Sequence, residues 1–167
     1  MNAFPMLARY NRWANRTAYA AAADLSDTDY RADCGAAFAS IHGTLNHLVV
    51  TDRIWMYRFT GRPYPQAALD ATACDDFAGL KAVREALDEE IVAWVEGLSD
   101  AELAATISYV RATTPEKITQ PLAPGLLHLF NHQTHHRGQV HAMLTRLTGQ
   151  APPFDLLYYQ REAGEGV

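Results

Sequence analysis

Hydrophobic residues recur at three- and four-residue spacings in four long segments of the chain, which is the period of an amphipathic α-helix. The segments cover residues 3–23, 37–60, 75–96 and about 123–148. Gly61, Gly97 and Gly149 each follow the end of a segment, where a glycine commonly terminates a helix. Four long helices joined by loops of moderate length predict an all-α fold, an antiparallel four-helix bundle.

The connections between these segments predict smaller elements. Residues 99–102 (SDAE) have the pattern of a capping box, which predicts a short helical turn. Residues 106–121 are rich in β-branched residues around a Thr-Thr-Pro-Glu centre and predict a small hairpin or an ordered loop. The tail after residue 151 is expected to pack one short apolar turn. No internal repeat or low-complexity linker divides the chain, so we expect residues 1–167 to form one domain.

The composition and net charge of the chain limit which binding partners and which cellular compartment we expect. The chain has 167 residues and a formal net charge of −5, which argues against binding to nucleic acid or to an anionic membrane. No apolar run approaches the roughly 20 residues of a membrane span, and the start lacks a basic flank followed by an apolar core. Cys34 and Cys74 are too few for a disulfide framework and are expected to be reduced thiols. We therefore expect a cytoplasmic protein.

Histidines are concentrated in the last predicted helix, where five of the chain's seven lie between positions 128 and 141. Since a helix advances about 100° per residue, His132 and His136 lie about 40° apart, with His136 inside the apolar stripe of this helix and His132 at its edge. His128 and His135 fall at the margin of that stripe, and His141 is expected to point outward. Two imidazoles at this spacing can ligate one metal ion, although a hydrogen-bonded core pair has the same pattern.

A third histidine lies in the second predicted helix. His47 is flanked by apolar residues and falls near the apolar face, so that it could complete a set of three nitrogens from two facing helices. His42 points elsewhere and is expected to be structural or exposed. A pH-sensitive histidine core that needs no metal also remains open, because histidine titrates near pH 6.5.

Three sequence blocks carry a resemblance to a known family: YNRWAN (10–15), GTLNHLVVTDRIWMYRFTG (43–61) and LLHLFNHQTHHRGQVHAML (126–144). With them the chain resembles the DinB/YfiT-like superfamily of metal-dependent enzymes, named for a DNA damage-inducible protein, over nearly its whole length. The resemblance implies that one histidine of the second helix and two of the fourth bind a divalent metal, zinc or nickel. These positions are His47, His132 and His136 here. It also implies a homodimer and a low-molecular-weight thiol as a reaction partner.

The predicted function follows from the number of ligands. Three neutral protein ligands leave a tetrahedral ion with an open position, whereas structural zinc sites are usually closed by four protein ligands. We therefore predict a metal-dependent enzyme that acts on a small molecule, either a thiol-dependent transferase or a hydrolase. The alternative is a non-catalytic metal-binding or stress-response bundle. The chain lacks G-x-S-x-G and H-E-x-x-H motifs, which leaves serine hydrolase and metalloprotease interpretations unsupported.

Several polar residues near the predicted ligands are candidates for supporting roles. Asp52 and His135 are the candidates for a catalytic acid or base. Asn46, Asp52 and Gln139 could orient the ligands by hydrogen bonds, or could make ordinary bonds on the helix surface.

Two further positions in the last helix follow the second histidine of the pair. Arg137 is expected either to make a structural ion pair or to meet an anionic substrate. Gly138 is expected to allow another helix to approach closely.

Overall fold

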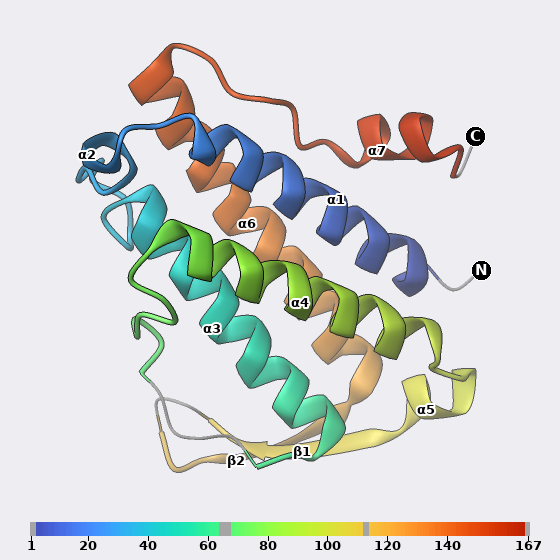
Figure 1. Ribbon diagram of the computed structural model, residues 1–167. Helices are drawn as coiled ribbons and strands as arrows, with labels where there is room; N and C mark the ends of the chain where they lie inside the picture. The colour runs from blue at the N-terminus through green and yellow to red at the C-terminus, as the bar shows by residue number, and fades with distance from the viewer. Residues whose placement is uncertain (1–2, 64–67, 112–113, 166–167) are drawn as a thin grey trace.

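The computed structural model describes residues 3–63, 68–111 and 114–165. Four long helices form a bundle (Figure 1), and their bounds are α1 (Phe4–Ala23), α3 (Ile41–Thr60), α4 (Phe77–Glu96) and α6 (Leu122–Thr148). The shorter elements are α2 (Asp27–Tyr30), α5 (Asp100–Ala104), α7 (Leu156–Ala163) and the antiparallel strands β1 (Thr106–Val110) and β2 (Lys117–Pro121). The predicted all-α bundle and its short hairpin are therefore confirmed.

The order of the helices around the bundle places α3 beside α6. Helix α1 packs against α4 and α6, and α3 packs against the same two helices, so α1 and α3 lie at diagonal corners. In Figure 1, α1 and α6 run in one direction and α3 and α4 in the other. Because α3 and α4 run in the same direction, α4 begins at the end of the bundle where α3 began. The α3–α6 contact, which is antiparallel, brings the two histidine-bearing segments together.

The core consists of apolar side chains whose spacing matches the helical period. Helix α1 buries four alanines, and these small side chains let α4 and α6 pack closely against it. The other three helices bury larger aliphatic residues. Representative fully buried positions are Ile41, Leu45, Val49, Leu80, Ile91, Leu126, Leu129 and Val140. A lipid bilayer could not be spanned by any helix that the structure describes, since none combines the necessary length with sufficient apolar character.

The helix ends show where the sequence prediction was accurate and where it was not. Helix α3 begins at Ile41 rather than at residue 37, because the Ser40 hydroxyl caps it by accepting a hydrogen bond from the Gly43 amide at 3.1 Å. Ala39 has a φ of 59° and turns the preceding chain away from the helix axis. Ser99 and Glu102 form the predicted capping box of α5.

A buried polar cluster joins three of the long helices. Asp52 of α3 accepts hydrogen bonds from Arg84 Nη1 of α4 at 2.7 Å and from Gln133 Nε2 of α6 at 2.5 Å. Arg84 Nη2 also lies 2.9 Å from Asp88 Oδ1. The Arg84, Asp52 and Asp88 side chains are between 1% and 3% exposed, so these charges are almost fully withdrawn from water. Burial raises the pKa of Asp88 to about 6, while Arg84 opposes that rise.

The same cluster extends to α1 through Arg137. This buried guanidinium donates hydrogen bonds to Asn11, to Asn15 Oδ1 at 3.2 Å and to Gln133 Oε1 at 3.1 Å. Asn15 Nδ2 in turn donates to Asp88 Oδ1 at 3.0 Å, so the cluster spans all four helices. Arg137 also lies over the Tyr10 ring, 5.3 Å from its centroid. Arg137 is only 1% exposed, so its guanidinium is held by side chains inside the bundle.

Candidate metal centre

Three imidazoles converge where α3 packs against α6. The Nε2 atom of His132 lies 3.3 Å from His47 Nε2 and 3.1 Å from His136 Nε2. One nitrogen from each ring lies within 4.8 Å of the others. Zinc binds histidine nitrogen at about 2.0–2.1 Å, so tetrahedral ligands lie roughly 3.3 Å apart. The separations of these nitrogens therefore match those of ligands around a single ion.

The tautomers of two of these rings also suit a cation. His47 Nδ1 lies 2.8 Å from the Leu69 carbonyl oxygen, which can only accept, so Nδ1 carries the proton. His136 Nδ1 donates in the same way to Gln139 Oε1 at 2.8 Å. The Nε2 atoms of these neutral rings are consequently unprotonated acceptors, and each lies 3.1–3.3 Å from His132 Nε2. A cation bound by these nitrogens would stabilise the arrangement, because each nitrogen lone pair would then have a partner.

The electrostatics keep these rings neutral. Burial, together with the neighbouring imidazoles His136 and His47, lowers the pKa of His132 to about 3. Burial also lowers the pKa of His47 and of His136. Metal ligation requires the unprotonated form of histidine, so these three side chains are ready to bind an ion at neutral pH.

An aromatic ring from the segment before α3 covers the site. The Phe38 ring stacks on His47 with a centroid distance of 3.7 Å and meets the edge of His136 at 5.5 Å. The placement of Phe38 requires a glycine at residue 43, because a Cβ there would lie 2.2 Å from the Phe38 carbonyl oxygen. The sequence gives no signal for this role of Phe38, because the apolar pattern predicts that the helix already begins at residue 37, whereas α3 begins at Ile41.

A loop from the α3–α4 connection orients His47. The Asn46 side chain accepts hydrogen bonds from the amides of Ala73 at 2.7 Å and Cys74 at 3.0 Å. These bonds fix the segment that presents the Leu69 carbonyl to His47 Nδ1. Asn46 thus supports the site through the backbone of this loop, without bonding to the ligand ring. The sequence alone does not predict the contact between Leu69 and His47, because it depends on how the α3–α4 connection folds back onto α3.

On α6, Gln139 supports the site directly. Its Oε1 accepts from His136 Nδ1, and its Nε2 lies 3.3 Å from His135 Nε2. His135 is exposed, with its ring centroid 4.8 Å from that of His136. Gly138, between these residues, is exposed and a Cβ there would have no neighbour within 4 Å. The expectation that Gly138 allows close helix packing is wrong, since it faces away from the other helices.

The remaining predicted residues lie outside the three-histidine group. Asp52 is held in the buried cluster by Arg84 and Gln133. His128 is exposed, with its ring 5.0 Å from that of Trp55 and 5.6 Å from that of His132. His42 meets the Tyr30 ring edge at 5.3 Å. His141 is only half-exposed, because Phe154 of the C-terminal segment packs edge-on against it at 5.6 Å.

Comparison with known proteins agrees with this architecture. Protein DinB of Bacillus subtilis (strain 168) is 24% identical to this chain over 159 residues, covering 92% of this chain and 91% of that protein. The solved structure of YfiT from Bacillus subtilis is described as a probable metal-dependent hydrolase with an unusual four-helix bundle topology. The two structures align over 87% of each chain with a TM-score of 0.59 and 18% sequence identity, which shows that the folds are similar. Residues 1–166 match the DinB family, and because this match spans nearly the whole sequence, the chain belongs to the DinB family.

Proposed function

We propose that this protein is a metal-dependent enzyme whose divalent ion is held by His47, His132 and His136. The observation that carries the proposal is the convergence of three neutral imidazoles at separations of 3.1 and 3.3 Å. The related fold of YfiT, described as a probable metal-dependent hydrolase, supports it. Zinc or nickel suits an all-imidazole ligand set. A bound ion would lower the pKa of a water or thiol at the site, which makes either a nucleophile at neutral pH.

An open position on the ion supports catalysis over a structural role. Among the described residues, the group close enough to share one ion contains these three histidines and no cysteine or carboxylate. Asp52 has its carboxylate engaged by Arg84 and Gln133. A site with three protein ligands leaves room for an exogenous ligand. We propose that this ligand is a small molecule, with a low-molecular-weight thiol as the first candidate and transfer or hydrolysis as the reaction type.

Of the two candidates for proton transfer, His135 is the better placed. Its ring is exposed and lies beside His136, and Gln139 bonds to both rings. A proton held at His135 could therefore be exchanged with solvent next to the proposed ion. Asp52 is less suited, because its neighbours in the buried cluster occupy its carboxylate. We also propose, from the family resemblance, that the protein acts as a homodimer in the cytoplasm.

Cobalt substitution tests the open position. Co²⁺ bound to three histidines should change its visible absorption toward that of a sulfur-bound ion when millimolar thiol is added. The His141→Gln variant should respond as the wild type does, because His141 lies outside the group of ligands. Cobalt that stays bound without any spectral change would contradict the open position and favour the non-catalytic metal-binding bundle.

Activity measurements then separate an enzyme from a binding protein. Purified protein should be screened with thiols and small electrophiles, and with simple esters and amides, before and after chelation of the metal. Turnover that is lost on chelation and restored by zinc or nickel would support the proposal. His135→Gln should reduce that turnover while it preserves the metal content. A protein that binds one ion per chain, binds thiol and shows no turnover would contradict the enzymatic assignment.

A further inference from the structure

A second concave site lies on the bundle between α3 and α4, separate from the three histidines. It is a groove of about 460 Å³, within the size range of pockets that bind small organic molecules. Its lining residues are Arg53, Met56, Tyr57, Arg62, Ala82, Val83, Ala86, Leu87 and Glu90. None of them is a proposed metal ligand, and only Arg62 belongs to the α3–α4 connection that supports the metal centre. The site therefore requires an explanation of its own.

The groove has an apolar floor because of the residues that α4 presents to α3. Met56 and Leu87 are buried at its base, and Val83 is half-buried beside them. Ala82 and Ala86, one turn apart on α4, are too small to fill the space above. An aliphatic or aromatic body placed there would exchange water for contact with these side chains, which is favourable in proportion to the apolar area buried.

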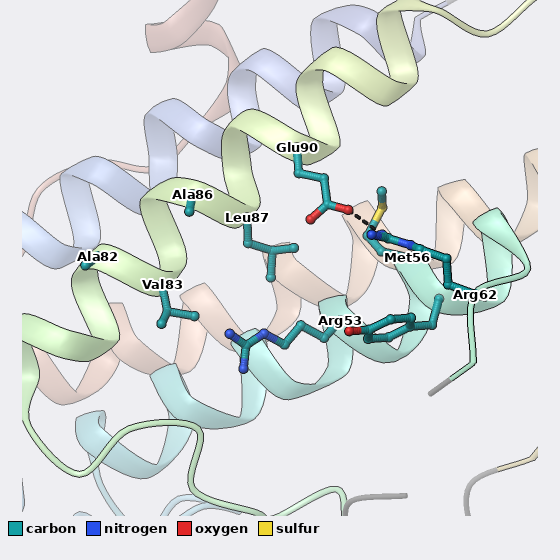
Figure 2. A pocket seen from close by; sticks show the side chains of 9 residues that line it. Arg53, Met56, Arg62, Ala82, Val83, Ala86, Leu87 and Glu90 are labelled. Atoms are coloured by element: carbon teal, nitrogen blue, oxygen red, sulfur yellow. Dashed lines mark hydrogen bonds and ion pairs between the residues drawn. The ribbon is translucent and has the colours of Figure 1, made fainter. Parts of the chain in front are cut away.

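A cation without a partner lies along this apolar surface. Among the residues that the structure describes, Arg53 and Arg161 are the two arginines with no hydrogen bond, ion pair or ring contact. Arg161 is exposed on α7, whereas Arg53 is half-buried in the groove. Figure 2 shows the Arg53 side chain extended toward Val83. A half-buried guanidinium has lost part of its hydration, so an anion that replaces this hydration is favoured.

The other end of the groove is closed by an ion pair. Arg62 pairs with Glu90 (Figure 2). The Arg62 guanidinium also lies 5.1 Å from the centroid of the Tyr57 ring. The charges of Arg62 and Glu90 cancel, so the groove retains the single positive charge of Arg53. This local charge has the opposite sign to the net charge of −5 on the whole chain. The groove thus combines one site for an anion with an adjoining apolar floor.

We propose that this groove binds a small organic monocarboxylate whose carboxylate pairs with Arg53 and whose apolar body lies on Met56, Val83 and Leu87. The planar guanidinium can donate two parallel hydrogen bonds to a carboxylate, and the aliphatic floor begins beside it. A purely inorganic anion would leave the apolar floor exposed to water. A neutral apolar molecule would leave Arg53 without a partner.

The test uses octanoate as the probe and backbone amide NMR of the full-length protein as the readout. Octanoate should produce saturable shift changes at Met56, Val83 and Leu87. Octanamide, which lacks the charge, and acetate, which lacks the apolar body, should each bind at least about 10-fold more weakly, since a charge-assisted pair and a buried alkyl chain each contribute more than 1.4 kcal/mol.

Amino-acid substitutions test how much the charge of Arg53 and the open space above the apolar floor each contribute to octanoate binding. Arg53→Gln should weaken octanoate binding about 10-fold, and Arg161→Gln is the matched control that should leave it unchanged. Ala86→Leu should fill the groove and abolish binding, and a leucine on this exposed helix position is compatible with folding. The circular dichroism spectrum of each variant checks that the bundle is intact.

Three results would overturn the proposal. The first is the absence of saturable shifts at millimolar octanoate. The second is octanoate binding that shifts the residues of the metal centre and is unaffected by Arg53→Gln. The third is a set of shifts at the groove that depends on protein concentration without any probe, which would show that a second copy of the chain occupies it.

Discussion

Replacing Asp52 with alanine removes one of the two carboxylates that neutralise the buried cations of the bundle. Asp52 accepts from Arg84 Nη1 at 2.7 Å and from Gln133 Nε2 at 2.5 Å, and the Asp52 and Arg84 side chains are 1% and 3% exposed. In the wild type, Asp52 and Asp88 balance the charges of Arg84 and Arg137. The Asp52→Ala variant retains an unbalanced buried positive charge and an amide donor without its acceptor.

The magnitude follows from the cost of an unpaired buried charge. Removing one partner of a buried ion pair costs about 3–5 kcal/mol. Asp88 still lies 2.9 Å from Arg84, so we expect the lower end of that range, about 3 kcal/mol. This is a large part of the roughly 5–15 kcal/mol by which domains are stable. Asp52→Asn keeps the shape and an acceptor oxygen for Gln133, and should cost about 2 kcal/mol.

Urea denaturation of metal-free protein at neutral pH, followed by circular dichroism, measures these differences. Asp27→Ala is the control, because Asp27 pairs with Arg31 at 3.0 Å in an exposed position, and its loss should change stability by no more than about 0.5 kcal/mol. A loss below about 1 kcal/mol for Asp52→Ala would refute the reasoning. Unchanged stability with loss of bound metal would instead place Asp52 in the metal centre.

Three further predictions concern the site, the pH dependence and the assembly. Gly43→Ala should displace Phe38 from His47 and weaken zinc binding by about 10-fold or more in a competition titration. Gly138→Ala is the control and should leave zinc binding unchanged, because a Cβ at residue 138 meets nothing within 4 Å. Equal effects of the two substitutions would contradict this role of Gly43. The pKa of Asp88, raised to about 6 by burial, lies above its ordinary value, so the folded protein retains a proton that the unfolded chain releases. The contribution of Asp88 to stability is therefore present at acid pH and lost as the pH rises through 6. The unfolding free energy of the wild type, relative to that of Asp88→Asn, should fall by about 1 kcal/mol or more between about pH 4 and 7. A relative unfolding free energy that rises over this pH range would refute the predicted sign. Sedimentation should give the mass of a dimer at micromolar concentration, and the monomer mass alone would count against the proposed homodimer.

Local patterns in the sequence predicted the helices and the histidine pair on α6, because both depend on residues a few positions apart. The apolar period identified α1, α4 and α6 nearly to the residue, and i, i+4 spacing placed His132 and His136 together. His47 was placed by its apolar flanks and by the family resemblance. These properties remain visible in a single sequence because the helix geometry is fixed.

The parts that were missed depend on segments far apart in the chain. Phe38 reaches His47 because the chain turns at Ala39, and the Leu69 carbonyl reaches it from 22 positions away. Asp52 is a candidate base from the sequence because it lies near the predicted ligands, whereas its partner Arg84 comes from another helix. A single sequence gives no signal for such pairings, since they are determined by how the helices pack.

The most direct test of the metal centre is the zinc content of reconstituted protein, measured by elemental analysis for the wild type, His132→Ala and His141→Ala. His132 lies between His47 and His136 in the group of three, and His141 packs against Phe154 outside it. We expect about one zinc ion per chain in the wild type and in His141→Ala, and none that survives gel filtration in His132→Ala. Stoichiometric zinc in His132→Ala, or an equal loss in His141→Ala, would contradict the three-histidine site.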